Sequence, residues 1–413
     1  MLQSPPSIET AQSWRVATAA LFTTLFAFGA AWITAVALKD IATEAGGVRT
    51  VPSLAMAMVW LCSGVGGTLM GRVAHRFSTR LVVLCGTAMI ATGLLISTLG
   101  PPYPLLIGHG LFIGLLGLGA INAPLYVYVT YWFDRRRGSA LALISSGSYL
   151  AGAMWPPIFE RFITMTSWRT TMVVFAVLQL VVIVPLAALV FKAPPVTPTA
   201  AVVSNGAQSN RVLGWSPNVV FGLMCVAALM CCVPMAMPQQ HLVAFCSDLG
   251  FSRTFGAWML TVLLGTAFLS RQVWGVISDR IGGLATLLVG SIWQAIAMAA
   301  FLLTLGEVGL ITVSAAFGLG FSGIIPAYVL ALRELYPAKE AYWRIPVVLM
   351  CTAFGMAAGG SIAGALYDYF GYYMPAFAVG VLANLINVAI VGALVLRRHG
   401  RRPSPPLTAS ATA

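Results

Sequence analysis

Residues 255–283 read FGAWMLTVLLGTAFLSRQVWGVISDRIGG, and this stretch decides how the chain folds. From Phe255 to Ser278 it is apolar over a length that can cross a bilayer, and Asp279 ends the run. Arg271 lies inside it, eight residues before Asp279. At 1.5 Å per residue, its Cα falls about 12 Å from that end of a hydrocarbon core about 30 Å thick. The stretch therefore predicts a transmembrane helix with a cation near its middle.

An arginine at this depth points to function. An unpaired charge in hydrocarbon is costly, so such residues normally face a bundle interior or a water-filled path and mark a substrate or ion route. The guanidinium stays protonated and presents a planar fork that suits a carboxylate. We expect Arg271 to bind an anion. The structural alternative is a cation neutralised by helix carbonyls or by a distant carboxylate.

The composition agrees with a membrane protein. The chain of 413 residues is 59% hydrophobic and only 8% charged, with a mean hydropathy of +0.90, which excludes a soluble globule. Residues 1–13 are polar and resemble no secretory signal, so the first span should be retained. Apolar runs of spanning length fall near 15–38, 51–71, 81–99, 104–131, 139–159, 169–191, 215–241, 254–278, 284–305, 308–332, 345–367 and 372–396.

These runs predict an all-α membrane protein with twelve transmembrane helices in two six-helix bundles. The first bundle should occupy residues 1–192 and the second residues 214–396, followed by a tail at 397–413. The segment 193–213 is rich in Pro, Ala, Thr, Ser and Asn, which is typical of a flexible linker.

Lysine and arginine residues set the orientation. If the N-terminus is cytoplasmic, seventeen of the 23 basic residues flank cytoplasmic helix ends and five flank the opposite ends. We therefore expect both termini in the cytoplasm and the chain in a bacterial-type inner membrane. The net charge of +12 then comes mostly from basic residues that set the membrane topology. No nucleic-acid surface is expected, because these charges stand singly or in threes at helix ends.

Other classes of chemistry find little support. The seven cysteines show no CxxC pairing, so neither a disulfide framework nor a metal site is expected. The four histidines are scattered, and no HExxH, GxSxG or P-loop pattern occurs. We expect no enzyme activity and no cofactor.

One loop pattern occurs in both halves. Residues 275–283 read GVISDRIGG after the eighth span, and residues 71–78 read GRVAHRFS after the second. Such a repeat at equivalent places indicates duplicated bundles. Gly275 would allow close helix packing and Asp279 could pair with a neighbouring helix start or an arginine. We expect Gly71, Arg76, Gly275, Asp279 and Arg280 to take part in gating.

With this duplicated motif, the chain resembles the major facilitator superfamily over essentially its whole length. The GxLxDRxG loop is intact in the second half and degenerate in the first, where His75 replaces the aspartate. The resemblance implies two bundles that rock about a central site to give alternating access.

A narrower resemblance is to monocarboxylate porters and bacterial oxalate/formate-type antiporters. Residues 131–142 (YWFDRRRGSALA), 146–152 (SGSYLAG) and 323–328 (GIIPAY) are similar to those proteins. Arg271 stands where these families carry a helix-eight arginine that binds a substrate carboxylate. The animal monocarboxylate carriers have an aspartate four residues before this arginine, where this chain has Ala267, and a lysine in the first helix, near Trp32 here. Residues 345–367 also lack the lysine associated with oxalate exchange. One fixed cation balances one carboxylate most simply, which favours a monocarboxylate.

Coupling to protons has few candidate residues. All eleven carboxylates fall in loops or near helix ends, so none is expected at mid-membrane. His241 is a candidate proton carrier, because an imidazole titrates at physiological pH. A structural or capping role near the outer end of the seventh helix remains open.

Polar side chains at matching depth are candidate partners of the anion. Tyr126 precedes Asp134 by the same eight residues that separate Arg271 from Asp279, and Asn122 lies one helical turn before Tyr126. The other candidates are Tyr149, Tyr328 and Trp274, each of which could instead be a packing residue.

The sequence thus predicts a monomeric secondary transporter of a small organic anion, a monocarboxylate, that works in the lipid bilayer. Proton symport, exchange and uniport all remain open. The alternatives are an antiporter of hydrophobic drugs and a membrane receptor that binds the anion without moving it.

Overall fold

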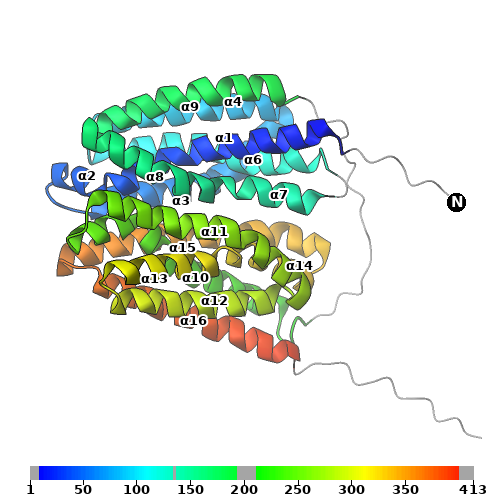
Figure 1. Ribbon diagram of the computed structural model, residues 1–413. Coiled ribbons are helices and arrows are strands. Elements are labelled where there is room, and N and C mark those ends of the chain that lie inside the picture. The colour runs from blue at the N-terminus through cyan, green and yellow to red at the C-terminus, as the bar shows by residue number, and fades with distance from the viewer. Residues whose placement is uncertain (1–8, 134–135, 193–210, 400–413) are drawn as a thin grey trace, which may run out of the picture.

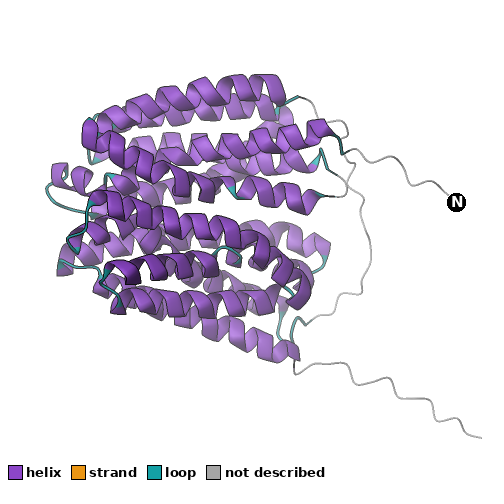
Figure 2. Cartoon of the chain, viewed as in Figure 1, coloured by secondary structure: helices purple, strands orange, loops and turns teal. Residues whose placement is uncertain are grey.

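The computed structural model describes residues 9–133, 136–192 and 211–399, and these are almost entirely helical (Figure 2). The predicted linker falls mainly outside them, and so does most of the predicted tail. Residues 211–215 form a tight turn before the second half, in which Val212 and Trp215 exchange two backbone hydrogen bonds of 3.0 Å.

Two groups of helices lie side by side (Figure 1). The first group comprises α1 (Ala11–Val36), α2 (Leu38–Glu44), α3 (Thr50–Arg76), α4 (Thr79–Ser97), α5 (Tyr103–Ile107), the π-helix η1 (Gly108–Leu118), α6 (Gly119–Thr130), α7 (Arg137–Ser145), α8 (Gly147–Met165) and α9 (Trp168–Val190). The second comprises α10 (Pro217–Asp248), α11 (Arg253–Ile281), α12 (Gly283–Leu303), α13 (Glu307–Phe321), α14 (Ile324–Leu335), α15 (Ala338–Phe370) and α16 (Met374–His399).

The twelve predicted segments are all present, but three of them are not single helices. The fourth is α5, η1 and α6 in continuous sequence, the fifth is α7 and α8, and the tenth is α13 and α14. Within the described ranges, eleven helical stretches are long and apolar enough to span a membrane, and the fifth segment is the exception.

The fifth segment differs for a physical reason. Helix α7 has only nine residues, and α8 carries two prolines and the charged pair Glu160 and Arg161. Helix α8 packs against α1 in its own half and against α11 in the other half. A helix that contacts protein on both sides does not need a uniformly apolar surface, so hydropathy alone underrates it.

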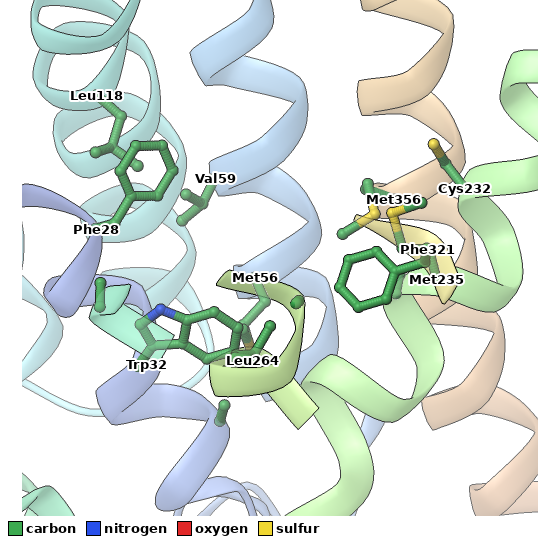
Figure 3. Packing of buried hydrophobic residues seen from close by; sticks show 14 of the residues in the cluster. Phe28, Trp32, Met56, Val59, Leu118, Cys232, Met235, Leu264, Phe321 and Met356 are labelled. Atoms are coloured by element: carbon green, nitrogen blue, oxygen red, sulfur yellow. The ribbon is translucent and has the colours of Figure 1, made fainter. Parts of the chain in front are cut away.

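The two halves meet closely where α8 crosses α1 and α11. A Cβ added at Gly152 would lie 2.7 Å from the ring of Trp32 and would also overlap Leu264. Trp32 and Leu264 lie next to Met56 in this contact (Figure 3). Glycine is therefore required at position 152 for this packing.

Ion pairs join the halves at the end of the molecule that carries α2, which we call the α2 end. Arg49 forms a bidentate ion pair with Asp248, with N–O distances of 2.6 and 2.8 Å. Lys39 contacts the same carboxylate at 2.8 Å. Arg253 binds Asp40 at 2.6 Å. Each pair links a residue of the first half to one of the second.

Further bonds reinforce this junction. Asp368 accepts the backbone N–H groups of Arg49 and Thr50 at 2.8 Å each, together with the hydroxyl of Thr50. The guanidinium of Arg49 lies 3.6 Å from the ring centroid of Tyr367 and donates to the hydroxyl of Tyr373 at 2.9 Å. The α2 end is therefore closed in this conformation.

Another ion pair at the same end lies inside the first half. Arg169 binds both carboxylate oxygens of Glu44 at 2.6 Å. These hydrogen bonds lower the pKa of Glu44, because they favour its charged form. The pair matches Arg49–Asp248 in chemistry but does not cross between the halves.

We predict that Asp248→Asn loosens the α2 end, because Lys39 and Arg49 lose their shared counter-charge. Removing one partner of a largely buried ion pair costs about 3 kcal/mol, which corresponds to roughly a 100-fold shift in the opening equilibrium. The measurement is the rate at which a polar maleimide labels Met56→Cys, with the native cysteines replaced by serine.

Glu44→Gln is the matched control, since it breaks an ion pair at the same end without separating the halves. Labelling should stay at the parent rate in this variant. An equal rise in both variants, or no rise with Asp248→Asn, would contradict the interpretation.

Candidate functional site

Arg271 is held on α11 by well-defined helix boundaries. The Ser252 hydroxyl accepts the N–H of Phe255 at the start of α11, and Gly282 ends the helix with a φ of +81°, which glycine adopts at low cost. The side chain of Arg271 is half-buried. Its Nη1 donates to the carbonyl oxygen of Ser322 at 3.4 Å. No carboxylate in the described part of the chain forms an ion pair with it.

Two predicted partners lie beside Arg271 and come from the opposite half. The guanidinium carbon is 5.2 Å from the ring centroid of Tyr149 on α8. The charge of Arg271 acts on the hydroxyl groups of both Tyr149 and Tyr126, and Tyr149 also acts on Tyr126. We call Arg271, Tyr126 and Tyr149 the arginine–tyrosine cluster. It lies between the halves, where a ligand would contact both.

The edge-to-face packing of Tyr149 on Phe321 of α13 fixes this arrangement, with ring centroids 5.7 Å apart. Asn122 lies one turn before Tyr126 on α6 and is half-buried. Its amide makes no hydrogen bond to another described residue, so it is free to bind a ligand.

Tyr328 and Trp274 are directed elsewhere. Tyr328 is fully buried, and its hydroxyl donates to Asn387 of α16 at 2.9 Å. The indole of Trp274 donates to the carbonyl of Leu319 at 2.6 Å, and a Cβ added at Gly323 would collide with this side chain. Tyr328 thus bonds within the second half, whereas Trp274 and Arg271 lie one turn apart on α11 and donate to the nearby carbonyls of Leu319 and Ser322.

The predicted gating residues lie at the end opposite α2. Asp279 and Arg280 are exposed and form no ion pair with a described residue, and Arg76 is exposed beside Phe77. Gly71 lies in the last turns of α3. A Cβ added at Gly275 would meet no atom within 4 Å, so the close packing expected of this glycine is absent in this conformation.

The loop after α11 has a partner that the sequence analysis missed. Glu334 accepts the backbone N–H of Gly283 at 2.8 Å and binds Arg398 at 2.6 Å. The carboxylate thereby connects the starts and ends of three helices in the second half.

His241 lies deeper than expected. The predicted span ends at residue 241, whereas α10 continues to Asp248 because the apolar run goes on to Cys246. The imidazole is fully buried. Its Nδ1 is 2.9 Å from the hydroxyl of Tyr373, and its Nε2 is 2.9 Å from the carbonyl oxygen of Gly360.

The ion pairs of the α2 end were not predicted from the sequence, because their basic members served only to indicate the orientation. The signal was present, since acidic residues of one half and basic residues of the other are predicted at the same helix ends. An open pocket of about 500 Å³ adjoins the pair Arg253–Asp40 and is also lined by Glu160 and Trp168.

Comparisons with known proteins identify the family. The model of the Major Facilitator Superfamily matches residues 20–246 and 219–412. The chain is 26% identical to monocarboxylate transporter 13 of Bos taurus over 388 residues, and this alignment covers 92% of this chain and 87% of that protein. Over 401 residues it is 22% identical to the MFS transporter asaE of Aspergillus flavus, with the same two coverages.

Solved structures show the same fold. The crystal structure of the peptide transporter POT in complex with sulfate matches with a TM-score of 0.71 at 15% identity. The alignment covers 93% of this chain and 95% of the POT chain. A bacterial homolog of the human lysosomal transporter Spinster has a TM-score of 0.69 at 13% identity and covers 96% and 100%. The family model and the fold agree over both halves, and the chain belongs to the Major Facilitator Superfamily.

Proposed function

We propose that this protein is a secondary transporter of a small organic anion, a monocarboxylate, and that Arg271 binds the carboxylate. The observation that carries the proposal is a half-buried guanidinium without a carboxylate partner among the described residues, placed between the two halves. A cation in such a site is stabilised when an anion binds, and a planar fork matches both oxygens of one carboxylate.

The tyrosines complete the proposed site. The hydroxyl groups of Tyr126 and Tyr149 would donate to the carboxylate or to a neighbouring oxygen of the substrate, and the amide of Asn122 offers one more polar contact. Because Arg271 belongs to the second half and the tyrosines to the first, the substrate would bridge the halves. This arrangement suits alternating access, in which both halves turn about one central site.

The closed α2 end fits an inward-facing state if that end faces outward, as the distribution of basic residues predicts. Both termini would then be cytoplasmic. Asp279 and Arg280, which are exposed here, would find partners in the first half when the opposite end closes. Gly275, around which there is open space, would then permit closer approach of the helices.

The names of relatives support two related functions. Monocarboxylate transporter 13 agrees with the proposed substrate. Another relative is the Agnestins efflux protein AgnL12 of Paecilomyces divaricatus, 20% identical over 321 residues, which favours efflux of another organic compound as the second candidate. The central cation favours an anion in either case.

The direct test is a counterflow screen in proteoliposomes. The purified protein is assayed against monocarboxylates, dicarboxylates and neutral hydrophobic compounds, each with and without an imposed pH gradient. We expect exchange of monocarboxylates. Exchange confined to neutral compounds would refute the proposed substrate class.

We predict that Arg271→Gln lowers monocarboxylate exchange about 100-fold or more, because two charge-assisted hydrogen bonds are lost. Arg271→Lys should keep the charge but retain only part of the activity, since an ammonium group cannot reproduce the bidentate geometry. The thermal unfolding of both variants serves as the folding control. Native exchange by Arg271→Gln would rule out this residue as the binding site.

We also predict that Tyr149→Phe and Tyr328→Phe act differently. Tyr149→Phe should weaken substrate affinity about fivefold, the effect of one hydrogen bond, with little change in stability. Tyr328→Phe leaves the buried oxygen of Asn387 without its donor, so it should lower stability by about 1–3 kcal/mol and leave affinity unchanged. Equilibrium binding and thermal unfolding, measured on both variants, separate these effects. The reverse pattern would exchange the roles of the two tyrosines.

A further inference from the structure

His241 lies at the junction of the two halves. Its ring contacts Tyr373 and Gly360 of the second half and, at 3.3 Å from Nε2, the hydroxyl of Ser53 on α3 of the first half. Tyr373 in turn accepts a hydrogen bond from Arg49. The imidazole is thereby linked to the ion pair that holds the α2 end closed.

The hydrogen-bond partners determine which ring nitrogen carries the proton. The carbonyl of Gly360 can only accept, so Nε2 must carry hydrogen and donate to it. The hydroxyl of Ser53 already donates its proton to the carbonyl of Arg49 at 2.7 Å, so it too can only accept from Nε2. Nδ1 is then free to act as an acceptor.

The hydroxyl of Tyr373 uses that acceptor. Its oxygen receives a hydrogen bond from Nη1 of Arg49, and its single proton points to Nδ1 of His241. A continuous chain therefore runs from Asp248 through Arg49, Tyr373 and His241 to Gly360. Every donor in this chain has one acceptor as long as the imidazole is neutral.

A second proton on the ring would disrupt this order. Protonated Nδ1 would become a donor and face the Tyr373 oxygen, so the Tyr373 proton would lose its acceptor in a buried site. The new cation would also lie near Arg49, whose charge opposes it, while the charge of Asp368 acts in its favour.

The acidic groups nearby offer little compensation. Asp248 is shared by Arg49 and Lys39, and Asp368 accepts from the backbone of Arg49 and Thr50. The remaining titratable group at this junction is Tyr367, whose ring is stacked on Arg49. The closed conformation therefore disfavours a charged imidazole.

We propose that His241 is a proton-binding site of the α2 end: the halves close over the neutral ring, and Nδ1 takes a proton from water when that end opens. An N–H bond forms at Nδ1 on opening, and the proton returns to water before the end closes again. Acid on this side of the membrane then holds the protein open. The proposal rests on the proposed function only in assuming that the α2 end opens during transport.

A second buried histidine provides a matched control. His109 is also fully buried and binds hydroxyl groups, with Thr34 at 2.7 Å and Ser97 at 3.0 Å. All its hydrogen-bond partners belong to the first half. Its protonation would not separate the halves, so substitution there should leave the acid response intact.

The test measures the opening of the α2 end without any substrate. Spin labels are placed on Thr43→Cys of α2 and Thr254→Cys of α11, which are exposed residues of opposite halves. The partly exposed native cysteines Cys62, Cys85, Cys225 and Cys351 are replaced by serine. The distance distribution between the labels is then recorded from pH 8 to pH 5 in liposomes.

In the parent protein we expect the ratio of open to closed molecules to rise about tenfold or more as the pH falls. His241→Gln should remain closed at every pH, because its amide can donate to Gly360 and accept from Tyr373 but does not titrate. His241→Leu is the second non-titrating variant, should the glutamine variant fail to fold. His109→Gln should respond like the parent, and Asp248→Asn should be more open than the parent at every pH, which shows that the labels detect opening.

An acid response that persists in both His241 variants would overturn the proposal, and so would a parent protein that stays closed at pH 5. Arg271→Gln should respond to acid like the parent. If the acid response is present but the counterflow screen finds no anion transport, the proposed function fails alone. If transport is found without an acid response, only the assignment of His241 fails.

Discussion

The ion pair between Arg49 and Asp248 determines the conformation in which this protein is seen. It is bidentate, Arg49 is almost fully buried with 6% of its surface exposed, and its two partners come from different halves. Opposite charges that are largely removed from water stabilise contact only while they stay together, because either one alone would be left unpaired. The closed α2 end and the burial of His241, which is linked to Arg49 through Tyr373, are consistent with this constraint.

Much of the fold could be predicted from the sequence, because a membrane-spanning helix must be apolar over a known length and must satisfy its own backbone. The fifth segment was predicted at 139–159 with the others, although its mean hydropathy is low because α8 contacts protein on both sides. The end of α10 was misplaced for a related reason: a run of apolar residues does not show where a helix leaves the membrane. His241 consequently lies inside the helix rather than at its end.

The site could be predicted only in part. Counting residues from the helix ends gives depth, and Tyr126 and Tyr149, which were chosen by depth, both lie near Arg271, while their role as substrate contacts stays a prediction. Depth does not give the direction of a side chain, which depends on how each helix is rotated in its bundle. Tyr328 therefore shares the depth of the cluster yet binds Asn387 within the second half, and the partners of Arg49 could not be chosen without the packing of α3 against α15.

Among the described residues Arg271 has no ionic partner, which has an electrical consequence under the proposed function. The empty protein carries one uncompensated positive charge between its halves, whereas the protein loaded with a monocarboxylate is neutral there. The loaded form would turn without sensing the membrane potential, and the empty form would return with a charge in the field. Moving one elementary charge through a potential of 100 mV corresponds to about 2.3 kcal/mol. The membrane potential would therefore act on the return of the unloaded carrier and determine the rate of net uptake. Exchange, which does not need that step, would not depend on the potential.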